Sequence, residues 1–195
     1  MRPVLVIALA LGALSCGKAA PAAGAGRLAI DQAQPRSAAP IVVTSSAIGK
    51  DGAIPARFSA NGANCSPPLA WTPARGARSY ALVLEDPDAP AAHPWSHWLI
   101  WNIPAATHGL AEGVAQGGRP AAPQGAVQGK GDAGSVGYFG PRPPSGIHHY
   151  HFQIFALDGS LALGPGSSRD ALVQAMRGHV IADGQMVGIF QAPHP

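Results

Sequence analysis

Short apolar runs separated by turn-forming residues dominate the chain from about residue 41 onward. Such runs, rich in β-branched and aromatic side chains, are typical of strands rather than of helices. Five of them stand out, and they cover residues 41–44, 80–84, 97–103, 149–157 and 186–190. Because few helical stretches lie between them, the pattern predicts a mainly β fold in which antiparallel sheets pack as a sandwich.

One helix is well signalled near the end of the chain. Ser167 is followed three residues later by Asp170, a variant of the capping box in which a hydroxyl and a carboxylate satisfy backbone N–H groups at a helix start. Gly178 is suited to a left-handed stop. Between Asp170 and Gly178 lies an apolar stripe made of Leu172, Val173 and Met176. We expect one or two peripheral helices, with this one against an end of the sandwich.

Residues 104–137 lack clear apolar periodicity. A connection of this length inside a compact domain is uncommon unless it has a role or a structure of its own. We therefore expect an ordered crossover, because the segment leads into a stretch rich in proline, glycine and histidine.

Composition supports one ordered domain. The chain has 195 residues, of which 47% are hydrophobic and only 12% charged, together with 25 Gly and 20 Pro. So much Gly and Pro suits short strands joined by turns, although compositional bias of the source genome is an alternative explanation. The net charge of +3 comes from scattered basic residues, which gives no sign of a nucleic-acid partner. We assign the domain to residues 41–195.

The beginning of the chain has the parts of an export signal. A positively charged Arg2 precedes an apolar stretch over residues 4–14, which is too short to span a bilayer comfortably as a permanent helix. Residues 1–15 are therefore predicted to be a signal peptide. Residues 16–40 are Ala, Gly, Pro and polar residues without periodicity, which predicts a flexible tether.

Cys16 follows the apolar stretch directly and resembles the acylated cysteine of the bacterial lipoprotein box. The match is imperfect at Ala13 and Leu14, and cleavage after Ser15 by an ordinary signal peptidase is the alternative. If Cys16 carries lipid, Cys65 has no partner for an intramolecular disulfide and is expected to be a small buried hydrophobe. These features predict an exported protein of the cell envelope, periplasmic and anchored to a membrane as a lipoprotein.

A cluster of acidic residues and prolines follows the strand expected at 80–84. Residues 85–90 contain three acids (Glu85, Asp86 and Asp88) and two prolines (Pro87 and Pro90). An apolar run typical of a buried strand therefore ends in a stiff, negatively charged turn. Aspartates often cap such turns through their own backbone, and this structural interpretation stands beside a functional one.

Residues 138–150 form a second informative stretch. Its alternating prolines and glycines predict a rigid loop whose backbone N–H groups can hold an anion. On the strand that follows, His148 and Tyr150 share a face with an apolar row, whereas His149 and His151 share the other face. His97 also lies on an apolar face of its strand. The His149 and His151 pair has no clear third ligand, so we expect neither a metal nor a cofactor.

Three segments together resemble the signature motifs of the phosphatidylethanolamine-binding protein family, also called Raf kinase inhibitor proteins, in its bacterial branch. The segments are residues 86–90 (DPDAP), 95–98 (WSHW) and 140–150 (GPRPPSGIHHY), and residues 64–71 and 176–182 fit the same branch. The resemblance covers roughly residues 41–191. His149 stands where the family usually has arginine, which puts the role of that arginine in doubt.

The resemblance implies a β-sandwich with a small anion-binding pocket at one end, which accepts phosphate, small carboxylates or the phosphorylethanolamine headgroup. Carried over by position, the ligand-binding residues are Asp86, Asp88, His97, Gly140, His148 and Tyr150. Asp86 is placed to accept an N–H from His97 or His148, which would orient the ring and favour the imidazolium that attracts phosphate. It is also placed to receive the ammonium group of ethanolamine.

The leading hypothesis is therefore an exported binding protein for phosphate or a phosphorylated lipid headgroup. The alternative is an inhibitor or regulator of a partner protein, such as a protease, that acts through surface loops; a role of this kind is reported for some relatives. Catalysis is the third possibility, but the chain has no Gly-x-Ser-x-Gly elbow, no His-Glu-x-x-His and no phosphate loop. Ser96 and His97 are neighbours on a strand and point to opposite faces, so they are not a dyad. We expect no enzyme activity.

Overall fold

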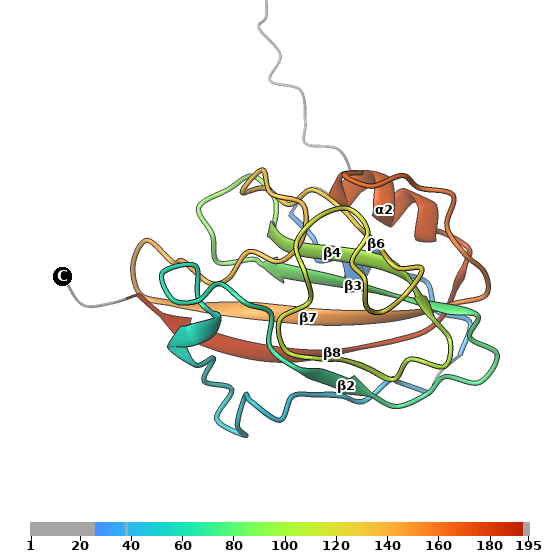
Figure 1. Cartoon of the computed structure of the whole chain (residues 1–195), viewed down its shortest axis with the longest axis horizontal. Coiled ribbons are helices and arrows are strands. Elements are labelled where there is room, and N and C mark those ends of the chain that lie inside the picture. Colours follow the sequence, from blue (N-terminus) through green and yellow to red (C-terminus); the bar gives the residue numbers. More distant parts are fainter. Residues whose placement is uncertain (1–25, 38, 193–195) are drawn as a thin grey trace, which may run out of the picture.

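The computed structural model describes residues 26–37 and 39–192, so the predicted signal peptide and Cys16 lie outside the described residues. The described chain forms two antiparallel sheets that pack face to face, as predicted (Figure 1). A five-stranded sheet has the strand order β6-β4-β3-β7-β8, and a three-stranded sheet has the order β1-β2-β5. None of the helices in the described part is long and apolar enough to cross a membrane.

The larger sheet contains four of the five predicted strands, and β1 of the smaller sheet corresponds to the fifth. Its strands are β3 (Ser79–Asp86), β4 (Trp95–Pro104), β6 (Val127–Gln128), β7 (Ile147–Leu157) and β8 (Val180–Gln191). The smaller sheet consists of β1 (Val43–Thr44), β2 (Leu69–Trp71) and β5 (Gly109–Leu110). The very short strands β2, β5 and β6 were not predicted, because two or three residues show no periodicity.

All eight residues of β3 are buried, because this central strand is covered on both faces. Between the two sheets, Leu82 and Leu84 pack in a core that includes Trp98 and Phe152. On the outer face of the larger sheet, Val83 belongs to a second core formed with the helices. A strand buried on both sides needs apolar residues at successive positions, which explains the continuous apolar run in the sequence.

Helix α2 (Arg169–Met176) confirms the predicted helix and lies over the outer face of the five-stranded sheet, rather than at an end of the sandwich (Figure 1). The N-cap is Ser168, whose Oγ accepts the backbone N–H of Ala171 at 3.3 Å. The predicted cap, Ser167, instead donates its hydroxyl to the carbonyl of Gly164. Gly178 has a φ of +77°, as expected for a left-handed stop.

The connection between β4 and β7 is an ordered crossover built around the buried side chain of Gln128. Gln128 Nε2 donates to the carbonyls of Ala115 and Gly117, and its Oε1 accepts the indole N–H of Trp98 at 2.7 Å. Every polar atom of this amide therefore finds partners inside the protein. The 3₁₀ helix η1 (Ala56–Phe58) packs beneath the loop that follows the crossover.

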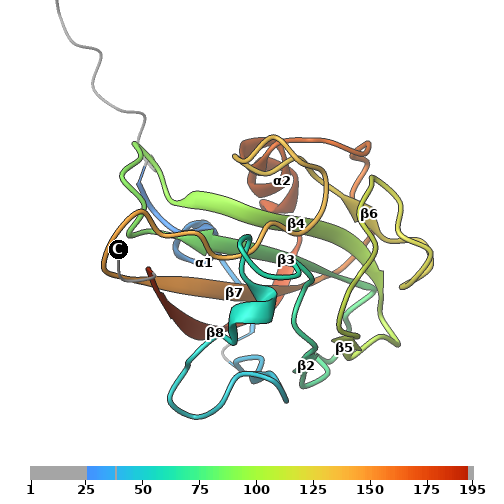
Figure 2. The ribbon, with the colours of Figure 1, turned by 60° about the vertical axis from the view of Figure 1, so that its left-hand side comes forward.

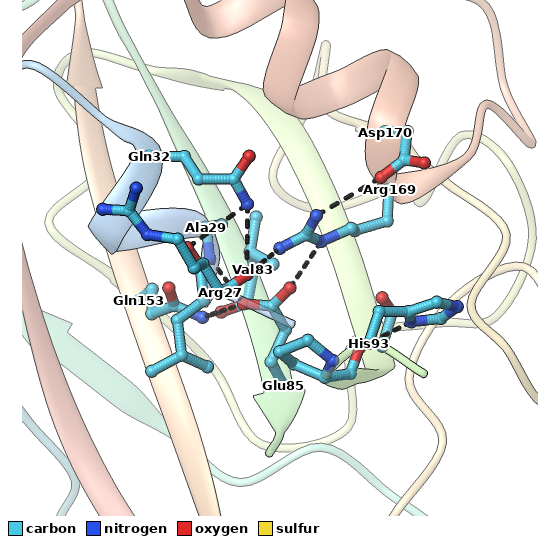
Figure 3. A network of polar contacts seen from close by, with 12 residues as sticks. Arg27, Ala29, Gln32, Val83, Glu85, His93, Gln153, Arg169 and Asp170 are labelled. Atoms are coloured by element: carbon cyan, nitrogen blue, oxygen red, sulfur yellow. Dashed lines mark hydrogen bonds and ion pairs between the residues drawn. The ribbon is translucent and has the colours of Figure 1, made fainter. Parts of the chain in front are cut away.

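The flexible tether predicted over residues 16–40 does not hold for residues 26–37, which we call the docked segment. This segment contains the short helix α1 (Ala29–Gln32) and packs on the outer face of the five-stranded sheet (Figure 3). Ala29 is only 1% exposed. The composition of residues 26–37 does not itself indicate this docking, because the segment's partners are side chains far along the chain.

Candidate functional site

The candidate site lies at one end of the five-stranded sheet, where three neighbouring strands bring polar side chains together. Asp86 is the last residue of β3, whereas His97 and His148 lie near the beginnings of β4 and β7. Both of these strands pair with β3 in antiparallel fashion, so the end of β3 meets their beginnings. The topology therefore brings Asp86, His97 and His148, which are far apart in the sequence, to the same end of the sheet.

Asp86 and His148 form a buried pair. The Nδ1 of His148 lies 2.7 Å from the Oδ2 of Asp86, and both side chains are less than 10% exposed. The Oδ1 of Asp86 accepts the backbone N–H of Asp88 at 2.9 Å, which is the turn-capping role considered from the sequence. One carboxylate thus fixes both the loop and the imidazole ring. Its partner is His148 and not His97.

His97 is held by the loop that precedes β7. Its Nδ1 lies 2.8 Å from the carbonyl oxygen of Phe139, to which it donates, and its ring packs edge-on against Tyr150 at a centroid distance of 5.1 Å. Burial lowers the pKa of His97 below its ordinary value of 6.5, although the Phe139 carbonyl and the Asp86 carboxylate oppose this shift. The expected charged imidazolium is therefore disfavoured at this position in the free protein.

These side chains open onto a pocket with a volume of about 450 Å³. Its walls combine a few polar groups with aromatic rings and prolines, which is the usual character of a small-molecule site. The lining residues are Asp86, Ala89, Pro90, Trp95, His97, Ala133, Phe139, Arg142, Pro143, Pro144 and His148. The volume exceeds that of a phosphate group, so the pocket has room for a substituent beside it.

Arg142 was missed by the sequence analysis, which treated residues 138–150 mainly as a backbone cradle. It stands at the exposed part of the pocket lining, and its guanidinium makes no ion pair or hydrogen bond with the residues described here. Because a guanidinium is always charged, Arg142 supplies the lining with a positive charge at any physiological pH. Arg142 lies within the motif at residues 140–150, but its place in the lining is set by how the loop closes over the pocket.

Gly140 and Tyr150 stand behind the lining. A Cβ on Gly140 would lie 2.1 Å from the carbonyl oxygen of Phe58, and its N–H is donated to the Oδ1 of Asn64 at 2.8 Å. Gly140 thus serves close packing of the loop. The Tyr150 hydroxyl is buried and has no hydrogen bond of good geometry with the described residues. Burial, followed by the nearby Asp86 carboxylate, raises its pKa, so it remains a neutral donor.

Asp88 does not line the pocket and is hydrogen-bonded to His149 instead. Its Oδ2 lies 2.7 Å from both the backbone nitrogen and the Nδ1 of His149. Its pKa is lowered because the hydrogen bonds and charge of His149 outweigh a desolvation effect in the other direction. His149 thus pairs with Asp88 at the position where arginine was expected. His151 binds the Oε1 of Gln185 through its Nδ1, and the described residues contain no group of three or more His, Cys, Asp or Glu side chains that could hold a metal.

Comparisons with known proteins agree with this architecture. The chain is 47% identical over 141 residues to the UPF0098 protein of Methanothermobacter thermautotrophicus, an alignment that covers 72% of this chain and 91% of that relative. It is 35% identical over 165 residues to a Mycobacterium tuberculosis protein with the provisional name of a lipoprotein, LppC, covering 83% of this chain and 78% of LppC.

Solved structures extend the comparison to the fold. The crystal structure of YbcL from Escherichia coli, described as a member of the mammalian PEBP family, has a TM-score of 0.70 and 31% identity, covering 80% of this chain and all of YbcL. The CT736 protein of Chlamydia trachomatis, provisionally described as a PEBP homologue, has a TM-score of 0.70 and 35% identity, covering 79% of this chain and 99% of CT736. The model of the phosphatidylethanolamine-binding protein family matches residues 44–191. The chain belongs to the phosphatidylethanolamine-binding protein family.

Proposed function

We propose that this chain is an exported binding protein whose pocket takes phosphate or a phosphorylethanolamine-like headgroup. The observation that carries the proposal is the convergence of the Asp86 and His148 pair with His97 on one pocket of about 450 Å³. The two histidines offer polar contacts at its base, and Arg142 adds a positive charge at its open side. Family membership, together with the lipoprotein name of one relative, supports a binding role in the cell envelope.

The hydrogen bonds of the two histidines leave the same ring atom for a ligand. His148 directs Nδ1 to Asp86, and His97 directs Nδ1 to the carbonyl of Phe139. In each ring the remaining nitrogen is Nε2, which in the neutral form is an acceptor and cannot donate to a phosphate oxygen. Binding therefore requires a proton at the contact, either taken up by an imidazole or carried by a phosphate oxygen of the ligand.

The negative charge of Asp86 is compatible with an anion in the pocket. Its Oδ2 already accepts from His148 and its Oδ1 from the backbone N–H of Asp88, so the carboxylate is directed toward donors of the protein. If a proton is taken up by His148, the carboxylate stabilises the resulting imidazolium. An ethanolamine ammonium would find Trp95 and Phe139 among the lining residues, which suit a cation over an aromatic face.

Isothermal titration calorimetry with phosphorylethanolamine and with inorganic phosphate tests the proposal. We expect tighter binding at pH 5.5 than at pH 7.5, since the contacts need a proton. At pH 6.5, the apparent binding enthalpy should change with the ionisation enthalpy of the buffer, which measures proton uptake directly. Absence of binding at both pH values would reject the proposal.

The matched variants are His148→Asn and His151→Asn. Both exchange a histidine of β7 for a neutral side chain, but His151 bonds to Gln185 and does not line the pocket. We expect His148→Asn to weaken binding and to reduce the proton uptake, whereas His151→Asn should leave both unchanged. Equal effects of the two variants would show that the anion binds elsewhere.

Export and anchoring through Cys16 are part of the proposal and have a separate test. Mass spectrometry of the mature N-terminal peptide from the host membrane should show an acylated Cys16. A free, unmodified N-terminus downstream of residue 15 would support the ordinary signal peptidase instead.

A further inference from the structure

We propose that the docked segment orients the domain so that its pocket faces the membrane that holds the chain's own lipid anchor, and that the pocket takes a phospholipid headgroup from that membrane. This inference rests on the proposed function for the pocket and on acylation of Cys16. It adds the source of the ligand and the surface through which the ligand enters.

The docked segment is fixed to the domain by buried side chains (Figure 3). The Oε2 of Glu85 accepts the backbone N–H of Ala29 at 2.8 Å, and the Oε1 of Gln153 accepts that of Ile30 at 2.7 Å. Arg169 bridges the two parts, because its Nε donates to Glu85 at 2.6 Å and its Nη2 to the carbonyl of Arg27 at 2.7 Å. Glu85 is fully buried, so losing the segment would leave its carboxylate short of a donor.

A second set of contacts attaches the other end of the docked segment to the domain. The backbone N–H groups of Arg36 and Ser37 donate to the carbonyls of Val180 and Ile181 at the beginning of β8. The side chain of Arg36 forms an ion pair with Asp158. Two separate attachments, with the buried Ala29 between them, make the docked segment part of the rigid domain.

The chain enters this segment beside one wall of the pocket. A Cβ built on Gly26 would lie 3.9 Å from the carbonyl oxygen of Ala92. Ala92 follows Pro90, a lining residue, by two positions, which places the two Cα atoms at most about 8 Å apart. Figure 2 shows the beginning of the docked segment, in blue, next to the green loop between β3 and β4. The entry point thus lies within about 15 Å of the Cα of Pro90 in the pocket wall.

The distance to the anchor then decides which end of the domain faces the membrane. Ten residue steps separate Cys16 from Gly26, and even a fully extended chain spans only about 36 Å over that length. The eleven residues of β7 run from the pocket end to the opposite end, and their ten steps cover about 34 Å. The anchor reaches the pocket end easily, whereas the opposite end is at the limit of its reach.

The pocket rim has the side chains that a phospholipid surface favours. Arg142 is exposed and has no ionic partner in the described chain, so it is available to lipid phosphates. Ile147 is 53% exposed and lies next to the pocket residue His148, where an apolar side chain can insert between headgroups. The acidic side chains on and beside the lining have protein partners, since Asp86 pairs with His148, Asp88 pairs with His149, and Asp132 accepts the backbone N–H of Ser96.

The orientation can be measured on the acylated full chain reconstituted in vesicles of phosphatidylethanolamine and phosphatidylglycerol. In a Cys65→Ser background, nitroxide labels are placed at Ser145→Cys, in the rim loop, or at Ser160→Cys, beyond the opposite end of β7; both positions are exposed. A lipid with a nickel-chelating headgroup should enhance relaxation of the label at position 145 several-fold more than that at position 160. Equal enhancement, or the reverse order, would overturn the inference.

Two further variants test the role of docking. Ala29→Asp places a second carboxylate against Glu85 and should release the segment, which lowers the ratio between the two labels toward one. Gln34→Asp adds the same charge at an exposed position and should keep the ratio of the parent chain. If Ala29→Asp keeps the parent ratio while circular dichroism shows an unchanged fold, docking does not set the orientation and the inference fails.

The lipid source is tested by competition. For the anchored chain, free phosphorylethanolamine should bind more weakly in vesicles that contain phosphatidylethanolamine than in vesicles of digalactosyldiacylglycerol, which has no phosphate. Equal binding in both would overturn the lipid source while leaving the proposed anion pocket in place. Failure of phosphorylethanolamine to bind the free domain in solution would instead reject the proposed function itself.

Discussion

The substitution Asp86→Asn separates two opposite effects of the pocket carboxylate. Removing a negative charge from an anion site relieves repulsion, worth about 2.8 kcal/mol at about 6 Å with an effective dielectric constant of about 20. The same substitution removes the attraction that stabilises a protonated His148, whose Nδ1 lies 2.7 Å from Asp86. At about 4 Å between charge centres, that attraction amounts to about 4.2 kcal/mol under the same assumptions.

The nearer interaction is the larger, and the difference is about 1.4 kcal/mol, which corresponds to about a tenfold loss of anion affinity. Titration calorimetry with inorganic phosphate at pH 6.0 measures this change, and thermal unfolding confirms that the variant folds. Asp88→Asn is the control, because Asp88 is half-exposed and bonded to His149 outside the pocket lining. Tighter phosphate binding by Asp86→Asn would refute the reasoning, since it would mean that Asp86 acts on the ligand mainly through repulsion.

Three further predictions follow from the burial and packing of single residues. The pKa of His97 is lowered on folding, so the unfolded chain binds more protons near pH 6 and the free energy of unfolding falls as the pH drops through about 6.5. Urea unfolding of His97→Gln should therefore show less acid destabilisation between pH 7.5 and 5.5 than the parent chain. An unchanged pH slope would contradict this. Gly140→Ala brings a Cβ into contact with the backbone of Phe58 and should lower the free energy of unfolding by about 2 kcal/mol or more. Thermal unfolding should show this as a drop in Tm of several degrees. An unchanged Tm would show that the loop relaxes freely. His149→Arg should preserve the exposed pair with Asp88 and change stability by less than about 1 kcal/mol, so a larger loss in chemical unfolding would reveal a further role for the imidazole.

The strands that carry the site could be predicted because each is buried in the structure and therefore appears in the sequence as a long apolar run. β3, β4 and β7 fill the centre of the larger sheet, and their polar ends were visible as Asp86, His97 and His148. The pairing of Asp86 with His148 rather than with His97 could not be chosen from sequence, because period-two alternation places a residue on a face but gives no distance across strands. Asp88 and Gly140 show the same limit, since their partners, His149 of β7 and Asn64, are distant in sequence.

The docked segment was missed for a different reason. Its Ala-rich and polar composition is that of a linker, and what orders it is a set of partners distant in sequence: Glu85, Gln153 and Arg169. A buried glutamate in an apolar strand was the available signal. Such a carboxylate needs donors, and asking which donors could reach Glu85 would have pointed to a second polar cluster on the outer face.

The end of β3 places two consecutive carboxylates in two different environments. Glu85 belongs to the network of the docked segment, and Asp86 to the pocket, on opposite faces of the strand. The pairing of β3 with β4 shifts register between Leu84 and Glu85, just before this division. A one-residue insertion or deletion within β3 would turn both acids to the opposite faces of the sheet, so that Glu85 would lose its bond to the docked segment and Asp86 its bond to His148 in a single event. Natural variation in this family is therefore expected to spare the length of this strand even where its side chains drift.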